Sequence, residues 1–262
     1  MSNEQIWLLE KATGLSATEL RMQNIKPDSL NLEAKEIYMN MLQQRKNHVP
    51  LQYILGQWEF MGLPINCRPG VLIPRFDTEI LAEEAIKFLM KYEKPKVLDL
   101  CTGSGCIAIS LAHFCKKSQP LVTGVDISPV ALELACENAH LNNLKIDFIL
   151  SDLFECVEGK FDCITVNPPY IPSNEIKKLQ KEVQQEPVLA LDGGTDGLDF
   201  YRSIIAACGE YMNESAAIFL EIGSEQGQDV FVMLDMLHKF ENVKIINDLE
   251  NRHRVVYAQK GK

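Results

Sequence analysis

Two patterns of apolar and polar positions divide the chain, and the change between them falls near residue 56. Before it, apolar residues recur at helical spacing, for example Ile37, Met41 and Leu42. Ser16 followed by Glu19 fits a capping box, which predicts that a helix begins there. Because this part contains no convincing strand, we expect a small all-helical domain over residues 1–56.

A β-type pattern replaces the helical one over residues 57–74. Residues 57–60 and 64–67 flank Met61-Gly62-Leu63 and predict a β-hairpin, which we interpret as a linker. A long amphipathic helix is expected next, and either Asp77 or Thr78 can cap it. We assign residues 75–262 to a third region, an α/β domain.

From residue 96 onward, buried-type strands alternate with helical patterns. The expected strands cover residues 97–100, 121–126, 146–150, 161–166, 216–221, 243–246 and 255–259. Near-continuous apolar strands joined by helices favour a mostly parallel sheet that is covered on both faces. The connection between the last two strands is too short and polar for a crossover helix, so the last strand is expected to be antiparallel. The fold class is therefore α/β, with a seven-stranded sheet.

The composition is that of an acidic globular protein. The chain has 262 residues, 46% of them hydrophobic, and its 26 Lys and Arg against 36 Asp and Glu give a formal net charge of −10. A protein that gains its affinity from phosphate contacts normally carries a basic stripe. We therefore expect a small molecule or another protein as the partner, and no direct nucleic-acid binding.

The cysteines and histidines are dispersed, whereas a zinc site needs them clustered at ligand spacing. None of the eight cysteines forms a Cys-x-x-Cys pair, which is typical of reduced thiols in the cytosol. Residues 1–5 do not resemble the start of a signal or transit peptide, and no stretch approaches the roughly 18 apolar residues of a membrane span. We expect a cytoplasmic protein with no metal and no membrane contact.

The first strand of the α/β domain runs into a glycine-containing turn. Residues 97–100 precede Cys101-Thr102-Gly103-Ser104-Gly105, after which a helix begins. Glycine lets the backbone adopt unusual dihedrals and lets a ligand approach closely. Asp126 ends the next strand at the same edge of the sheet, where its carboxylate can accept hydrogen bonds from both hydroxyls of a ribose. We therefore expect a nucleotide-type cofactor at this edge.

Two classes of cofactor are compatible with this turn. Residues 103–108 also satisfy the dinucleotide fingerprint, so a nicotinamide oxidoreductase is a competing interpretation. Asp99, however, lies inside the strand before the turn, and in this the segment resembles class I methyltransferases, although Cys101 stands where glycine is common. That resemblance implies S-adenosylmethionine as the cofactor. It also implies that Asp152 and Leu153 contact the adenine, whereas the alternative makes Asp152 a turn residue.

The fourth strand ends in Asn167-Pro168-Pro169-Tyr170. The two prolines remove two backbone donors and stiffen the turn, so that the Asn167 oxygen and nearby carbonyls can face outward as a fixed pair of acceptors. Such a pair suits a planar –NH₂ group, which Tyr170 can clamp with its aromatic face. An amide nitrogen is a poor nucleophile, and hydrogen bonds to Asn167 and the Pro168 carbonyl would favour charge developing on it. Orientation alone can supply roughly 7–11 kcal/mol of the barrier.

As a bare string these four residues could form a structural turn. Placed after the fourth strand of this sheet, they resemble the motif of enzymes that methylate the –NH₂ of adenine, cytosine or glutamine. We assign catalysis to Asn167, Pro168 and Tyr170, and substrate binding to the same residues with Pro169. The expected cofactor-binding residues are Asp99, Cys101, Thr102, Gly103, Ser104, Gly105, Asp126, Asp152, Leu153 and Asn167.

Further segments resemble the release factor glutamine methyltransferase (HemK/PrmC) family of protein-(glutamine-N5) methyltransferases. They are residues 71–79, 186–191, 193–198 with Tyr201-Arg202, and 220–223 with Gln226-Gly227. Phe76 departs from the family, which usually has proline there. The resemblance implies methylation of the glutamine in the Gly-Gly-Gln loop of bacterial class I peptide chain release factors, a partner that the helical domain and hairpin help to hold.

Several alternatives to this interpretation stay open. A glutamine of a ribosomal protein, or the amino group of adenine in nucleic acid, could be the methyl acceptor instead. The chain could also be a catalytically silent binding module. The helical domain could be a packing appendage that only covers apolar surface.

Overall fold

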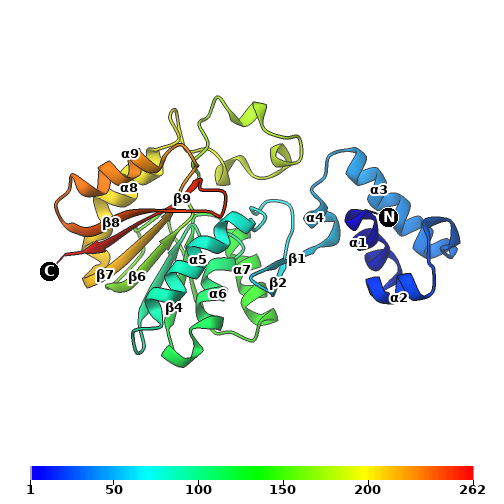
Figure 1. Ribbon diagram of the computed structural model, residues 1–262, viewed down its shortest axis with the longest axis horizontal. Coiled ribbons are helices and arrows are strands. Elements are labelled where there is room, and N and C mark those ends of the chain that lie inside the picture. Colours follow the sequence, from blue (N-terminus) through cyan, green and yellow to red (C-terminus); the bar gives the residue numbers. More distant parts are fainter. Residues whose placement is uncertain (1, 262) are drawn as a thin grey trace.

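The computed structural model describes residues 2–261, and its N-terminal helices form a unit with a core of their own (Figure 1). They are α1 (Asn3–Thr13), α2 (Ala17–Met22), α3 (Leu32–Lys46) and α4 (Leu51–Leu55), with a 3-10 turn at Pro27–Ser29. Leu8, Leu9 and Tyr38 are buried in this separate core. The capping box of Ser16 and Glu19 begins α2. The predicted bundle of short helices is therefore confirmed.

The hairpin follows α4 and consists of β1 (Gln57–Phe60) and β2 (Leu63–Asn66), which pair antiparallel. Met61 and Gly62 have φ values of +50° and +76°, the left-handed conformation that two-residue hairpin turns require. Three apolar side chains on the hairpin join the main core of the α/β domain: Phe60, Leu63 and Ile65. The hairpin is thus part of the α/β packing and not a loose connection.

The main sheet has seven strands in the order β5-β4-β3-β6-β7-β9-β8. The strands are β3 (Lys96–Leu100), β4 (Leu121–Asp126), β5 (Asp147–Leu150), β6 (Phe161–Val166), β7 (Met212–Glu221), β8 (Phe240–Asn247) and β9 (His253–Lys260). The first five strands in that order pair parallel, whereas β9 is antiparallel to both β7 and β8. All seven predicted strands and the antiparallel last strand are confirmed; β7 and β8 begin a few residues earlier than predicted.

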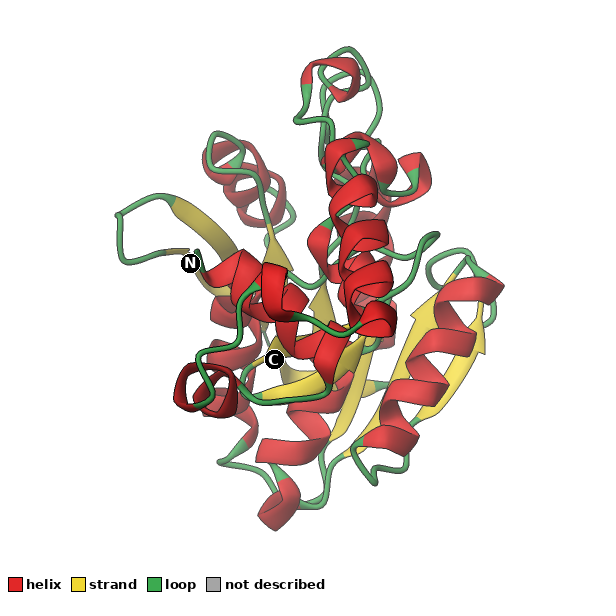
Figure 2. Cartoon of the chain, turned by 90° about the vertical axis from the view of Figure 1, so that its right-hand side faces the viewer, coloured by secondary structure: helices red, strands yellow, loops and turns green. Residues whose placement is uncertain are grey.

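Helices cover both faces of this sheet, as Figures 1 and 2 show. The helices are α5 (Phe76–Leu89), α6 (Cys106–Phe114), α7 (Pro129–Leu141), α8 (Asp199–Cys208) and α9 (Gly227–Asp235). One core cluster packs α5, α6 and the end of α7 against the sheet, and a second packs α8 and α9 against the opposite face. Figure 2 views the molecule from the side of the N-terminal helices. None of the helices within residues 2–261 is long and apolar enough to cross a membrane.

The start of α5 differs from the prediction that Asp77 or Thr78 caps it. The helix begins at Phe76, and the preceding Arg75 has extended backbone dihedrals without a side-chain capping bond. Asp77 pairs instead with Arg254 (3.1 Å), and the Thr78 hydroxyl accepts a hydrogen bond from Asn167 (3.2 Å). Both side chains are held by residues distant in the sequence, so neither is available as a cap.

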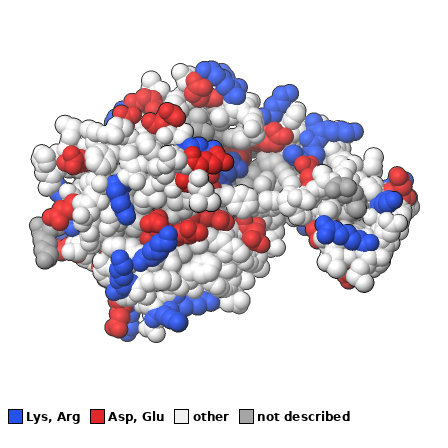
Figure 3. Space-filling model, viewed as in Figure 1, with Lys and Arg blue, Asp and Glu red and all other residues white. Residues whose placement is uncertain are grey.

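A long irregular segment connects β6 to α8 and extends above the sheet in Figure 1. It contains three 3-10 turns, at Ile176–Lys178, Val183–Gln185 and Val188–Ala190. On the face shown in Figure 3, basic and acidic side chains are intermingled, and no continuous basic stripe is visible there.

Candidate functional site

A cavity of about 200 Å³ lies at the carboxyl ends of the parallel strands. Its walls are formed by residues from the loops after β3, β4, β5 and β6, which meet at one edge of the sheet because these strands run in the same direction. Two further segments close it, residues 70–75 before α5 and residues 187–190 before α8. The predicted site residues on its lining are Cys101, Thr102, Gly103, Ser104, Asp126, Asp152, Leu153, Asn167 and Pro169; Asp99, Gly105, Pro168 and Tyr170 do not line it.

The turn after β3 is held in shape by backbone bonds and by glycine. Cys101 and Gly103 both have φ of +56°, in the left-handed region where glycine costs least. That explains why glycine is common at the position of Cys101. A Cβ atom on Gly103 would meet nothing closer than 3.9 Å, so this residue presents open backbone to the cavity. A Cβ atom on Gly105 would lie 3.1 Å from that of Ala135, so Gly105 serves the close packing of α6 on α7.

Asp99 supports this turn from below instead of lining the cavity. It is fully buried, and it accepts hydrogen bonds from the hydroxyls of Thr102 (2.6 Å) and Thr165 (2.8 Å). Burial raises the pKa of Asp99 to about 6, although these two hydrogen bonds oppose the rise. The structure therefore places Asp99 as an internal brace of the turn.

Asp126 lies on the cavity with part of its hydrogen-bonding capacity free. Its two oxygens accept backbone N–H bonds from Gly103 (2.8 Å) and Ser128 (2.9 Å). Burial raises its pKa, and these backbone bonds oppose that rise. A carboxylate has about four acceptor positions. Room therefore remains for two hydroxyl donors of a ribose.

The far end of the cavity combines an exposed carboxylate with apolar side chains. Asp152 is exposed, and the half-buried Leu153 beside it has φ of +45°. Phe200, at the start of α8, also lines the cavity, although no sequence motif predicts a role for it. A planar ring could pack between Leu153 and Phe200 while Asp152 accepts a hydrogen bond from an amino group on it.

Asn167 begins the turn after β6 and lines the cavity. Its side-chain Nδ2 donates to the hydroxyl of Thr78 (3.2 Å), a cavity residue that sequence reasoning had considered only as a helix cap. The Oδ1 atom of Asn167 is therefore left as an acceptor. Pro168 is buried, and the half-buried Tyr170 packs against the core cluster of α8 and α9.

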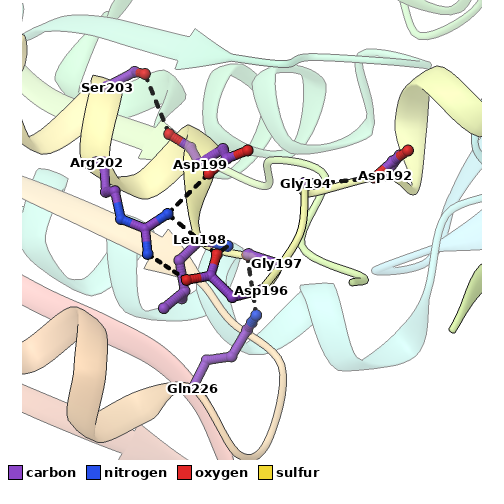
Figure 4. A network of polar contacts seen from close by, with 9 residues as sticks. All are labelled: Asp192, Gly194, Asp196, Gly197, Leu198, Asp199, Arg202, Ser203 and Gln226. Carbon is purple, nitrogen blue, oxygen red and sulfur yellow. Dashed lines mark hydrogen bonds and ion pairs between the residues drawn. The ribbon is translucent and has the colours of Figure 1, made fainter. Parts of the chain in front are cut away.

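The glycine-rich motif at residues 193–198 braces the backbone of Tyr170. A Cβ atom on Gly193 would lie 2.7 Å from the Cα of Tyr170, so only glycine fits this approach. The side-chain amide of Gln226 donates to the carbonyls of Tyr170 (2.9 Å) and Gly197 (3.0 Å). Figure 4 also shows Arg202 bound to Asp196 and Asp199 in the same network. These motif residues therefore shape the turn that carries Asn167, without contacting the cavity.

A buried carboxylate joins the two segments that close the cavity. Glu186 is 4% exposed; it accepts a hydrogen bond from the Ile73 backbone N–H (2.9 Å) and pairs with Arg75. Pro187, Leu189 and Ala190 follow it directly along the chain and line the cavity. Both segments carry motifs that resemble the family, but nothing in the sequence alone places Glu186 at the site.

The helical unit contacts the first of these segments and the stretch of chain that leads to the second. The hydroxyl of Tyr53 in α4 donates to the carbonyl of Val71 (2.7 Å), next to the cavity wall. Arg45 and His48 lie 3.8 and 3.7 Å from Glu182, in the segment that leads to Glu186. The helices therefore contact one wall of the cavity directly, at Val71, and on the other side they reach only Glu182 in the segment that leads to the second wall.

No group of three or more His, Cys, Asp or Glu suited to a metal ion occurs within residues 2–261. All eight cysteines are free, and five of them are buried.

Comparison with known proteins identifies the family. Residues 3–56 match the PrmC N-terminal domain, and residues 77–194 match the methyltransferase small domain. The release factor glutamine methyltransferase of Fusobacterium nucleatum is 42% identical over 242 residues, which cover 89% of this chain and 68% of that protein. The one from Thermodesulfovibrio yellowstonii is 38% identical over 253 residues, covering 95% and 89%. The chain belongs to the release factor glutamine methyltransferase family.

Solved structures support the fold of this family member. A ribosomal protein L11 methylase from Lactobacillus delbrueckii subsp. bulgaricus has a TM-score of 0.54 at 23% identity, covering 76% of this chain and 86% of that one. A methyltransferase from Pyrococcus furiosus has a TM-score of 0.59 at 20% identity, covering 78% and 91%. The predicted class I methyltransferase fold is confirmed. Members of this family are S-adenosylmethionine-dependent enzymes, so the chain is one as well. The two alternatives, a nicotinamide oxidoreductase and a catalytically silent binding module, are therefore wrong.

Proposed function

We propose that this chain transfers the methyl group of S-adenosylmethionine to the side-chain amide nitrogen of the glutamine in the Gly-Gly-Gln loop of class I peptide chain release factors, in the cytoplasm. The observation that carries this proposal is Asn167. It stands on the cavity at the end of β6 with its Nδ2 engaged by Thr78, so its oxygen can receive a donor. The relatives in the comparison are release factor glutamine methyltransferases, which supports the choice of substrate.

The residues around the cavity suit S-adenosylmethionine, which supplies a methyl group on a sulfonium when it is bound. The open backbone at Gly103 would lie against its methionine part, and Asp126 would accept from the ribose hydroxyls. Asp152, Leu153 and Phe200 would hold the adenine. In this proposal Asp99 and Gly105 act indirectly, by holding the turn in shape.

The role of the Asn-Pro-Pro-Tyr turn is to orient the substrate amide. The Asn167 oxygen and the Pro168 carbonyl would each accept one N–H of the glutamine –NH₂, which aims its nitrogen and favours positive charge developing there. Tyr170 packs against the core cluster of α8 and α9 and is only half-buried, and in this proposal its accessible part would contact the glutamine. After transfer the nitrogen can release its proton, and the proposal requires no dedicated strong base.

We also propose that the helices before residue 56 bind the release factor. They have their own core; Tyr53 contacts the cavity wall at Val71, and Arg45 and His48 lie near Glu182 in the segment that leads to the second wall. A glutamine side chain alone offers few contacts, so binding energy from remote parts of the partner must hold it in place. The hairpin is a weaker candidate for this role, because three of its side chains are part of the main core.

The decisive experiment is mass spectrometry of an intact release factor after incubation with the protein and an isotopically labelled methyl donor. We expect one added methyl group on the glutamine of the Gly-Gly-Gln loop. The variant Asn167→Ala should lower kcat by roughly 10²–10³ while it leaves cofactor affinity nearly unchanged, because it removes an acceptor aimed at the reacting nitrogen. Near-normal turnover of that variant would refute the assignment of Asn167. Methylation of a ribosomal protein but of no release factor would refute the substrate.

A further inference from the structure

Asn138 is a buried polar residue inside α7 to which the proposed reaction assigns no role. Its relative exposure is 0%, whereas the other buried residues of this helix are apolar: Ala131, Leu134, Ala135 and Ala139. Asparagine is a weak helix former, and burying its amide costs free energy unless the amide is hydrogen-bonded. The groups that Asn138 binds therefore have to account for its presence in the helix.

The amide of Asn138 binds the backbone of the hairpin, which lies beside α7 (Figure 1). Its Oδ1 accepts from the N–H of Asn66, the last residue of β2 (2.8 Å), and its Nδ2 donates to the carbonyl of the same residue (3.2 Å). Cys67 donates its N–H to Gly56 across the hairpin (3.0 Å), so by the alternation of an antiparallel pair both main-chain groups of Asn66 point away from β1. Asn138 therefore satisfies the two groups that a further strand would otherwise bind.

The same amide also reaches the turn that lines the cofactor cavity. Nδ2 donates to the carbonyl of Ser104 (2.9 Å), a residue that is 3% exposed and lines the cavity. Ser104 stands between Gly103 and Gly105, whose φ values are +56° and +80°. Glycine rotates at little steric cost, so a peptide group beside it needs a partner outside the turn to hold its direction. Asn138 supplies that partner.

The hairpin decides which end of the Asn138 amide faces Ser104. The two ends of an asparagine side chain have nearly the same shape, so packing alone selects weakly between them. Asn66 presents one donor and one acceptor, and these match the amide in a single orientation. A reversed amide would set its nitrogen against the Asn66 N–H and its oxygen against the carbonyls of Asn66 and Ser104.

We propose that Asn138 is a positioning residue for the cofactor: anchored on the hairpin, it holds the Ser104 carbonyl toward α7 and keeps the turn at residues 102–105 in its binding shape before the cofactor arrives. This inference rests on the proposed cofactor site, in which the turn lies against the methionine part of S-adenosylmethionine. Asn138 itself does not line the cavity, so it acts through Ser104. Without this bond the turn samples other arrangements, and the apparent affinity falls in proportion to the fraction of molecules that keep the binding shape. Saturating cofactor restores that shape, so the transfer step itself is unchanged.

The test uses the full-length protein with Asn138→Ala and Asn138→Leu. Alanine removes the amide altogether, and leucine keeps the branched outline of asparagine without its polar atoms. The matched controls are Asn142→Ala and Asn142→Leu. Asn142 follows the last residue of α7, and its Nδ2 donates to the Pro64 carbonyl of the same hairpin (2.9 Å) and to the Asn138 main-chain carbonyl (2.9 Å), but to no residue of the turn within the described chain. Each protein is measured for S-adenosylhomocysteine affinity, for KM of S-adenosylmethionine, for kcat on an intact release factor, and for thermal unfolding.

We expect both Asn138 variants to bind S-adenosylhomocysteine roughly tenfold more weakly and to raise the KM of S-adenosylmethionine by a similar factor. At saturating cofactor, kcat and the KM of the release factor should change by less than about threefold. The Asn142 variants should lower the unfolding temperature but keep the cofactor affinity of the natural protein. A residue that only stabilises the fold would not change the affinity, because nearly every molecule is still folded at the assay temperature.

Several results would overturn the positioning role. They are unchanged cofactor affinity in the Asn138 variants, an equal loss of affinity in the Asn142 variants, or a loss that lies in kcat at saturating cofactor instead of in affinity. If Asn138→Leu does not fold, Asn138→Ala decides by the same measurements. If neither variant folds, Asn138 serves the structure alone and the proposal fails.

Failure of the proposed function is distinguishable from these results. A natural protein that binds S-adenosylhomocysteine but leaves every release factor unmodified refutes the substrate, and the affinities of the variants still decide the role of Asn138. A natural protein that does not bind S-adenosylhomocysteine refutes the cofactor site, and the role of Asn138 fails with it.

Discussion

The hydrogen bond and ion pair of Glu186 allow a quantitative prediction of how much this residue stabilises the segments around the cavity. Its carboxylate is almost fully buried (side chain 1% exposed), whereas Arg75 is 37% exposed. In Glu186→Ala the backbone N–H of the buried Ile73 loses its acceptor, which costs about 1–3 kcal/mol. The lost ion pair adds about 1 kcal/mol or less, because solvent screens Arg75. We expect the variant to lose roughly 1–4 kcal/mol of unfolding free energy.

Glu186→Gln separates these two contributions, because glutamine keeps an acceptor for Ile73 but has no charge. It should lose only about 1 kcal/mol. The suitable control is Glu175→Ala in the same connecting segment, because the side chain of Glu175 is 45% exposed and pairs only with the neighbouring Lys178 (2.7 Å). That control should change stability by less than about 0.5 kcal/mol.

The same variants should also change ligand affinity. Residues 73–75 and 187–190 both contribute to the cavity lining. If the loss of Glu186 lets these two segments move apart, part of the binding free energy of the cofactor is used to order them again. For Glu186→Ala we expect S-adenosylhomocysteine to bind about tenfold more weakly, which corresponds to about 1.4 kcal/mol. Urea unfolding and isothermal titration calorimetry measure the two effects. If Glu186→Ala unfolds like the natural protein and keeps its affinity, Glu186 does not hold these walls together.

Three further predictions address the cofactor, the pH dependence and the partner. Asp126→Ala should weaken S-adenosylmethionine binding by about 1.5–3 kcal/mol for each lost hydrogen bond, and unchanged affinity by calorimetry would remove Asp126 from the site. Burial raises the pKa of Glu221 from 4.5 to about 7. Between these values the folded protein holds a proton that the unfolded chain has released, so the free energy of unfolding falls as the pH rises through that interval. Urea unfolding should therefore show Glu221→Gln gaining stability relative to the natural protein between pH 5 and pH 8, and a constant difference would contradict the raised pKa. A chain shortened to begin at Gln57 keeps the hairpin and should bind cofactor but methylate an intact release factor poorly; equal kcat/KM in the two folded proteins would show that the helices serve packing only.

The sequence by itself determined the order of elements and the edge of the sheet at which the site lies. Strands buried on both faces are continuous apolar runs, and the helices between them have their own spacing, so both patterns are local and visible in one chain. The turn at residues 101–105, Asp126 and Asn167 could be placed for the same reason. Each follows directly after such a strand, and the ends of parallel strands meet at one edge.

Tertiary structure alone decided which side chains complete the site and which only support it. Asp99 looked like a ligand contact because it precedes the turn, but a strand covered on both faces buries whatever side chain it carries. Thr78 reaches Asn167 across 89 residues of sequence, and Glu186 reaches Ile73 across 113. Contacts between such distant positions leave no periodic pattern in the chain. They exist only because the sheet, α5 and the segment before α8 fold against one another, and this packing gives Thr78 and Glu186 their partners.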